Sequence, residues 1–170
     1  MKARELIIKS DGTVRIPLGR SSGHGKCAII DIEDVPRVAG FNWAIRGNGY
    51  AGRSVGSATE YLHRVICPPR FGEEPDHINR NRLDNRRENL RSVSRSINRL
   101  NTLARGISKH KGAYRQPNSA KSPWSARIGT NGKVRYLGCF KTVAAAHAAW
   151  LAAAKMQYGD DAALGIEPTE

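Results

Sequence analysis

Residues 76–101 read DHINRNRLDNRRENLRSVSRSINRLN, and the rest of the chain is organised around this stretch. Asp76 offers a hard carboxylate oxygen to a divalent cation, and His77 beside it can accept a proton near neutral pH. Asn89 follows twelve residues after His77, and Asn98 follows twenty-one residues after it. The pattern predicts a site at which a metal ion and a histidine act on a phosphodiester.

The order Asp-His, Asn, Asn at these spacings resembles the HNH nuclease motif of phage-type homing endonucleases, in the variant with asparagine in place of the last histidine. The resemblance implies a ββα-metal fold over about residues 61–101, in which a hairpin carries the Asp-His pair and a helix returns the last ligand. It also implies that His77 is the catalytic base and that Asp76 and Asn98 hold one Mg²⁺ or Mn²⁺. Asn89 then supports the loop and orients His77.

His63 lies thirteen residues before Asp76, where the family pattern also has a histidine. Two interpretations stay open for it. It can support the active site, or it can be a half-buried histidine that packs and donates one hydrogen bond, which is the commoner outcome.

The excess positive charge lies in the middle of the chain. Residues 78–141 contain sixteen Lys and Arg against two acids, a net charge of +14, whereas residues 1–77 carry +2 and residues 142–170 carry −3. Combined with the motif, this block predicts binding to double-stranded DNA. The expected contacts near the motif are Arg80, Arg82, Arg86 and Arg87.

The sequence does not support a membrane-bound protein or a protein with a small-molecule cofactor. No apolar run approaches membrane-spanning length, and no basic amphipathic helix has a leucine or aromatic face, so no membrane partner is expected. Cys27, Cys67 and Cys139 are odd in number and too far apart for a zinc knuckle. We expect a cytoplasmic protein, in a bacterial host cell if it is phage-encoded, without a small-molecule cofactor.

The amino-terminal part contains short apolar runs separated by turn signals such as Asn48-Gly49, which is typical of strands and hairpins. Residues 34–40 are predicted to form a short helical turn capped by Asp34. Residues 61–66 fit a strand or a helix. Together with the motif, this β-rich segment forms the predicted nuclease domain, residues 1–101.

A second module is predicted beyond a basic linker at residues 102–112, which we expect to neutralise phosphates without a fixed fold. Residues 124–128 alternate as in a strand, a second strand follows an Asn-Gly turn, and an alanine-rich helix begins after Thr142. The module covers residues 113–160, and residues 161–170 form a tail.

This second module resembles the APETALA-type DNA-binding domain, in which a helix packs behind a small three-stranded sheet whose outer face enters the major groove. Side chains alternate along a strand, so the basic residues cannot all share one face and some lie at the rim. By this resemblance, Arg115, Arg127 and Tyr136 face the groove, and Lys121, Lys133 and Arg135 contact phosphates or bases.

The sequence therefore predicts an α+β protein with a β-rich amino-terminal segment, a ββα-metal nuclease core and a small DNA-binding domain. Its expected function is that of a site-selective, homing-type nicking endonuclease. One site cuts one strand, so a monomer nicks and a homodimer is needed to cut both strands. Two alternatives stay open: a transcriptional regulator with a non-catalytic nuclease-like motif, and an RNA-binding or packaging protein.

Overall fold

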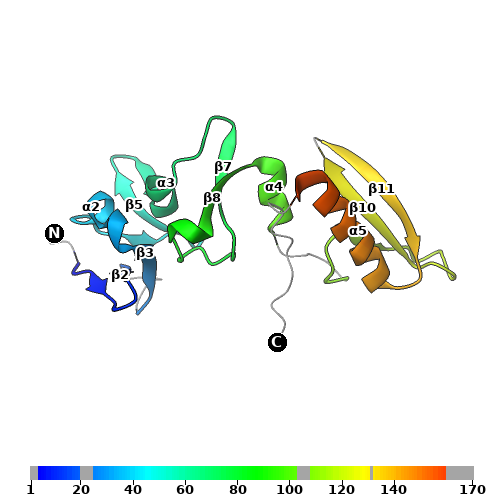
Figure 1. The fold of residues 1–170 in the computed structure, drawn as a ribbon, viewed down its shortest axis with the longest axis horizontal. Helices are drawn as coiled ribbons and strands as arrows, with labels where there is room; N and C mark the ends of the chain where they lie inside the picture. Colours follow the sequence, from blue (N-terminus) through cyan, green and yellow to red (C-terminus); the bar gives the residue numbers. More distant parts are fainter. Residues whose placement is uncertain (1–3, 20–24, 103–107, 131, 160–170) are drawn as a thin grey trace. The chain divides into compact units, whose positions relative to one another are not determined.

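A computed structural model describes residues 4–19, 25–102, 108–130 and 132–159 of the chain (Figure 1). The protein has the predicted α+β class, with several small antiparallel sheets. It divides into two compact units, Met1–Ser94 and Arg95–Glu170. No helix among the described residues is long and apolar enough to cross a membrane.

The first sheet confirms the strands expected near the amino terminus. It contains β1 (Ile7–Ile8), β2 (Thr13–Pro17) and β3 (Cys27–Asp31), all antiparallel. Alternation along β2 buries Val14 and Ile16 and leaves the intervening arginine exposed. These two side chains begin the core of the first unit.

Short elements complete that core. They are η1 (Ile32–Asp34), α2 (Val35–Val38), β4 (Ala44–Ile45), β5 (Ala51–Val55), β6 (Ala58–Tyr61) and α3 (Leu62–Ile66). Residues 62–66 thus follow the helical alternative, whereas Tyr61 ends β6. Burial of large side chains drives the packing of these elements, and the largest are Trp43, Ile16, Ile30, Leu62 and Val38.

The predicted cap at Asp34 is wrong. Its side chain makes no hydrogen bond to the helix that follows. Instead, the fully buried carboxylate accepts hydrogen bonds from Arg87 Nε at 2.8 Å and Nη2 at 2.6 Å. A guanidinium fifty-three residues further along the chain therefore replaces the local backbone partner.

The motif forms two strands and a helix in the expected order. These are β7 (Glu73–His77), a loop that contains η2 (Arg87–Asn89), β8 (Leu90–Ser94) and α4 (Arg95–Leu100). β7 and β8 pair antiparallel, with Asp76 opposite Arg91 and His77 opposite Leu90. β7 and β8 belong to the first unit, whereas α4 belongs to the second.

The second unit has the sheet and helix predicted for it (Figure 1). β9 (Ala113–Arg115), β10 (Trp124–Thr130) and β11 (Lys133–Phe140) form an antiparallel sheet with β10 in the middle, and α5 (Val143–Tyr158) packs on it. The Thr142 side chain caps α5 by accepting a hydrogen bond from the Ala145 amide at 3.1 Å, as expected.

α4 is held inside the second unit. Leu100 is buried in one cluster with Ile128 and Trp150. Lys111 Nζ donates hydrogen bonds to the carbonyl oxygens of Arg99, Leu100 and Thr102 at 2.7, 2.5 and 2.6 Å. A lysine ammonium suits these carbonyls because they end a helix without intrahelical donors.

The structure therefore divides the chain before α4, and not at the end of the motif. The predicted linker also differs from what is observed. Residues 103–107 lie outside the described residues, whereas residues 108–112 have a defined structure. Lys111 contacts α4, and the Gly112 carbonyl accepts a hydrogen bond from the Arg127 amide at 3.0 Å.

Candidate active site

The end of β7 carries the Asp-His pair into the interior of the first unit. Asp76 is 7% exposed and His77 is 4% exposed. Opposed residues of paired antiparallel strands lie on the same face, which explains why Asp76 meets Arg91. Arg91 donates to Asp76 Oδ2 from Nη2 at 2.8 Å and from Nε at 3.0 Å, so the buried carboxylate is paired with a cation.

His77 lies in a cluster of rings. Its ring centroid is 5.3 Å from that of His63 on α3 and 5.6 Å from that of Tyr50, which precedes β5. The ring centroids of Tyr50 and His63 are 4.7 Å apart. The structure thus brings His63 beside His77, and His63 Nδ1 is buried with no hydrogen-bond partner among the described residues.

Both imidazoles are held in the neutral form. Burial lowers the pKa of His63 to about 3, and repulsion from His77, once that ring is protonated, and from Arg64 acts in the same direction. Burial also lowers the pKa of His77, although the hydrogen bond to Asn85 and the charge of Asp76 oppose this shift. At neutral pH, His77 is therefore an uncharged base.

Asn85 fixes which nitrogen of His77 carries the proton. Asn85 Nδ2 donates to the Leu83 carbonyl at 3.0 Å, so its Oδ1 is the atom that faces His77 Nε2 at 3.3 Å. An amide oxygen can only accept a hydrogen bond, so Nε2 bears the proton in the neutral ring. The lone pair then resides on Nδ1.

Asn89 joins the two sides of the loop between β7 and β8. Its Oδ1 accepts from the Asn79 amide at 2.8 Å, and its Nδ2 donates to the Asp84 carbonyl at 2.7 Å. The Asn79 side chain in turn donates to Asp84 Oδ2 at 2.8 Å. This network closes the loop that carries Asn85.

β3 anchors the same loop from the other side. The Ile29 amide donates to the Leu83 carbonyl, and the Asn85 amide donates to the Ile29 carbonyl, both at 2.7 Å. The buried side chain of Asn85 is therefore positioned by backbone contacts as well as by its own hydrogen bond.

The four arginines expected near the motif have different surroundings. Arg86 pairs with Asp84 at 2.8 Å and Arg87 with Asp34 at 2.6 Å, so acids of the protein itself engage both of them. The hydrogen bond from Arg86 also lowers the pKa of Asp84. These contacts give Arg86 and Arg87 a structural part to play in the loop.

Arg82 borders the ring cluster. Its guanidinium carbon lies 4.9 Å from the Tyr50 ring centroid, and its Nη1 donates to the Asn48 carbonyl at 2.6 Å. Arg80 begins the loop with a φ of 63°, in the left-handed region. Arg82 thus brings a cation to the edge of the histidine site.

The register of the carboxy-terminal sheet shows on which face each predicted DNA-binding residue lies. Arg127 is opposite Tyr136, so the two share a face, whereas Arg115 is opposite Trp124 and lies on the other face. Arg135 is opposite the buried Ile128. Lys133 begins β11, and Lys121 lies in the connection before β10, so both occupy rim positions, as does Arg115.

Sequence reasoning missed Asn85, Tyr50 and Arg91. The cross-strand register could have indicated Arg91, because a hairpin from His77 to Leu90 aligns it with Asp76. Asn85 and Tyr50 gave no signal, because tertiary contacts with β3 and α3 place them at the site.

A hard divalent cation suits the donors of the motif. Asp76 supplies a carboxylate oxygen and Asn98 an amide oxygen, and hard ions prefer such ligands. Asp76 lies in the first unit and Asn98 on α4 of the second. Another group of acids lies around Arg87: its guanidinium pairs with Glu33 and Asp34, and its backbone amide donates a hydrogen bond to Asp31.

Comparison with known proteins bears on this site. The model of the HNH endonuclease family matches residues 60–100, which include α3, β7, β8 and α4. No curated protein matches the chain, and no solved structure does. The match covers His63, Asp76, His77, Asn89 and Asn98. Residues 60–100 are thus an HNH endonuclease domain, and such a domain indicates a metal-dependent nuclease.

Proposed function

We propose that the protein hydrolyses phosphodiester bonds of double-stranded DNA at selected sites, with His77 as the general base and one divalent metal ion. The observation that carries this proposal is the state of His77. The side chain is neutral, buried and held in one tautomer by Asn85, next to the carboxylate of Asp76.

His77 removes the proton from the attacking water. Its Nδ1 carries the lone pair, and its Nε2–H remains bound to Asn85 throughout. The Asn85 oxygen stabilises the imidazolium that forms, because a hydrogen bond to a charged donor is stronger than one to a neutral donor. General base catalysis of this kind contributes about 10²–10⁴-fold to the rate.

We assign Asp76 and Asn98 as ligands of Mg²⁺ or Mn²⁺. When bound, the ion neutralises negative charge on the scissile phosphate and on the leaving oxygen. Arg91 holds the Asp76 carboxylate in a defined orientation on β7. Asn89 keeps the loop closed, and His63 packs against His77 from α3.

The second unit selects the site on DNA. Arg127 and Tyr136 share one face of the sheet, which suits an APETALA-type entry into the major groove. Rim cations of this unit contact phosphates, and Arg80 and Arg82 add general affinity beside the motif. These contacts come from Arg115, Lys121 and Lys133 at the rim and from Arg135 within β11.

The homing role extends the same proposal. A single site of this kind cuts one strand, so the monomer nicks and a homodimer cuts both strands. The protein would act in the cytoplasm of a bacterial host as a phage-encoded enzyme. The support for this part is the resemblance of the motif to phage-type homing endonucleases.

Cleavage of supercoiled plasmid tests the proposal. The wild type is incubated with and without Mg²⁺, beside His77→Ala and Asn98→Ala. We expect metal-dependent open circles with the wild type alone, and retained DNA binding in both variants. Equal cleavage by His77→Ala would rule out the assigned base, and equal cleavage by Asn98→Ala at limiting Mg²⁺ would rule out the assigned ligand.

A further inference from the structure

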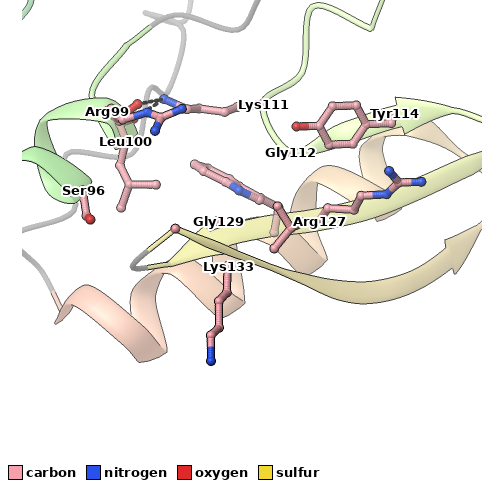
Figure 2. Close-up of a pocket in the computed structure, with 12 residues that line it drawn as sticks. Ser96, Arg99, Leu100, Lys111, Gly112, Tyr114, Arg127, Gly129 and Lys133 are labelled. Atoms are coloured by element: carbon pink, nitrogen blue, oxygen red, sulfur yellow. Dashed lines mark hydrogen bonds between the residues drawn. The ribbon is translucent and has the colours of Figure 1, made fainter.

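A pocket of about 520 Å³ lies within the second unit, between α4 and the β10–β11 hairpin (Figure 2). α4 contributes Arg99 and Leu100 to its wall, and the opposite wall comes from the strands. Trp150 of α5, which is buried, also lines the pocket. The remaining lining residues are Ser96, Lys111, Gly112, Tyr114, Arg127, Gly129, Gly132, Lys133 and Val134.

The lining of this pocket is cationic. It contains Arg99, Lys111, Arg127 and Lys133, and no acid is among the described residues that line it. Lys111 also covers the carbonyl end of α4, whose partial negative charge would otherwise repel an anion. The pocket therefore attracts a negatively charged group.

The side chains are arranged on two sides (Figure 2). Arg99 and Lys111 lie together at the α4 side, Tyr114 and Arg127 lie along the strands, and Lys133 points away from both groups. The Arg127 guanidinium carbon is 5.6 Å from the Tyr114 ring centroid, and this ring is 52% exposed. An anion at the α4 side thus has an accessible aromatic ring within the same pocket.

Bare backbone makes room for a bulky ligand. Gly112, Gly129 and Gly132 line the pocket without side chains. Any Cβ at Gly112 would lie 2.0 Å from Trp150, so glycine is required there. The volume is within the range of ligand sites, and four cations stand among the apolar and glycine residues that line this pocket.

We propose that this pocket binds a phosphodiester group of the DNA, with the phosphate against Arg99 beside the charge of Lys111, and the adjoining nucleoside against Tyr114 and Arg127. The inference rests on the proposed DNA substrate. It adds a contact from α4 to those assigned to the sheet face. Arg99 is the distinguishing residue, because it belongs to the HNH domain and not to the sheet.

The salt dependence of DNA binding tests this pocket. Affinity for a labelled duplex is measured by fluorescence anisotropy without divalent metal, for the full chain, Arg99→Gln, Arg127→Gln and the double variant. Lys141→Gln is the matched control, because Lys141 is an exposed cation that follows the opposite end of β11 from the pocket.

Each phosphate contact contributes about 0.9 to the slope of log K against log salt. We expect the double variant to lose about one unit of slope and about tenfold in affinity near 0.1 M salt, with Lys141→Gln close to the wild type. If the double variant matches Lys141→Gln while the wild type binds duplex, the pocket is overturned and the nuclease proposal stands. If the wild type does not bind duplex, both fail.

Amide resonances of Gly112, Gly129 and Gly132 provide the second measurement. We expect these resonances to shift with a short duplex at micromolar concentration, and with inorganic phosphate only at concentrations at least about a hundredfold higher. Equal affinity for inorganic phosphate and duplex would overturn the phosphodiester assignment in favour of a free-anion site.

Discussion

His77 Nε2 faces the Oδ1 atom of Asn85 at 3.3 Å, and the Leu83 carbonyl fixes the orientation of that amide. In the Asn85→Ala variant, no side chain at residue 85 would fix the tautomer and the ring orientation of His77. We expect plasmid cleavage to fall by about ten- to a hundredfold, as for other residues that orient a reacting side chain. Asn81→Ala, in the same loop but exposed, is the control and should retain activity. A fall in DNA affinity equal to the fall in rate would contradict the assignment.

Removing the ion pair between Arg91 and Asp76 should make the stability of the first unit more dependent on metal. Arg91→Met leaves the buried carboxylate without this cation and should reduce the free energy of unfolding by about 3 kcal/mol. Mg²⁺ should then raise the melting temperature of Arg91→Met more than that of the wild type, because a bound cation offsets the same charge. Arg91→Lys keeps the charge and serves as control. Thermal melts with and without Mg²⁺ measure both effects, and equal shifts would refute the prediction.

His63 should make the stability depend on pH. Its pKa is about 3 in the folded protein and 6.5 in the unfolded chain, so the unfolded state binds more protons between these values. Stability attributable to neutral His63 is thus present above pH 6.5 and is lost as the pH falls, by about 1.4 kcal/mol per pH unit. Urea unfolding between pH 7 and pH 5 should show a slope that rises toward this value as the pH falls.

His63→Phe is the matched variant for that measurement, because it keeps a ring at the position and removes the titrating group. For this variant, the free energy of unfolding should change less steeply with pH than in the wild type. The difference in slope should correspond to at most one bound proton. His77 contributes in the same direction in both proteins, since its pKa is also lowered. Identical slopes for wild type and variant would show that His63 does not titrate as inferred.

Two glycines of the second unit have similar backbone angles but different surroundings. Gly112 has a φ of 74° and Gly132 a φ of 77°, yet only a Cβ at Gly112 would overlap Trp150. Gly112→Ala should cost about 3 kcal/mol or more, whereas Gly132→Ala should cost about 1 kcal/mol for the backbone alone. Guanidinium unfolding monitored by Trp fluorescence gives both values. Similar losses would mean that Trp150 moves aside freely.

The elements that the sequence predicts well are those whose signals are local. Residues 124–158 follow a strand, turn, strand and helix pattern, and Thr142 caps the helix as its position suggests. The motif likewise identifies Asp76 and His77 by spacing. In each case, neighbouring residues carry the information.

The remainder depends on partners distant in sequence. Asp34 binds Arg87 rather than the start of its own helix, and Asn85 reaches His77 because β3 anchors its loop. The compact units divide before Arg95, ahead of the predicted end of the nuclease domain at residue 101, for the same reason. Nothing near Leu100 indicates that it packs with Trp150. Such contacts follow from tertiary packing, which local patterns do not specify.

The burial of α4 in the second unit limits how enzymes of this design can be dissected or recombined. A helix of six residues is marginal by itself, and here Ile128 and Trp150 pack against its Leu100 and Lys111 supplies its final hydrogen bonds. A fragment that stopped after the motif would keep Asn98 but lose both supports. A new DNA-reading module spliced in after residue 101 would have the same defect. A module that is to be exchanged should therefore begin at Arg95. Asn98, the last residue of the nuclease motif, would then stay in the same unit as the residues that pack against α4.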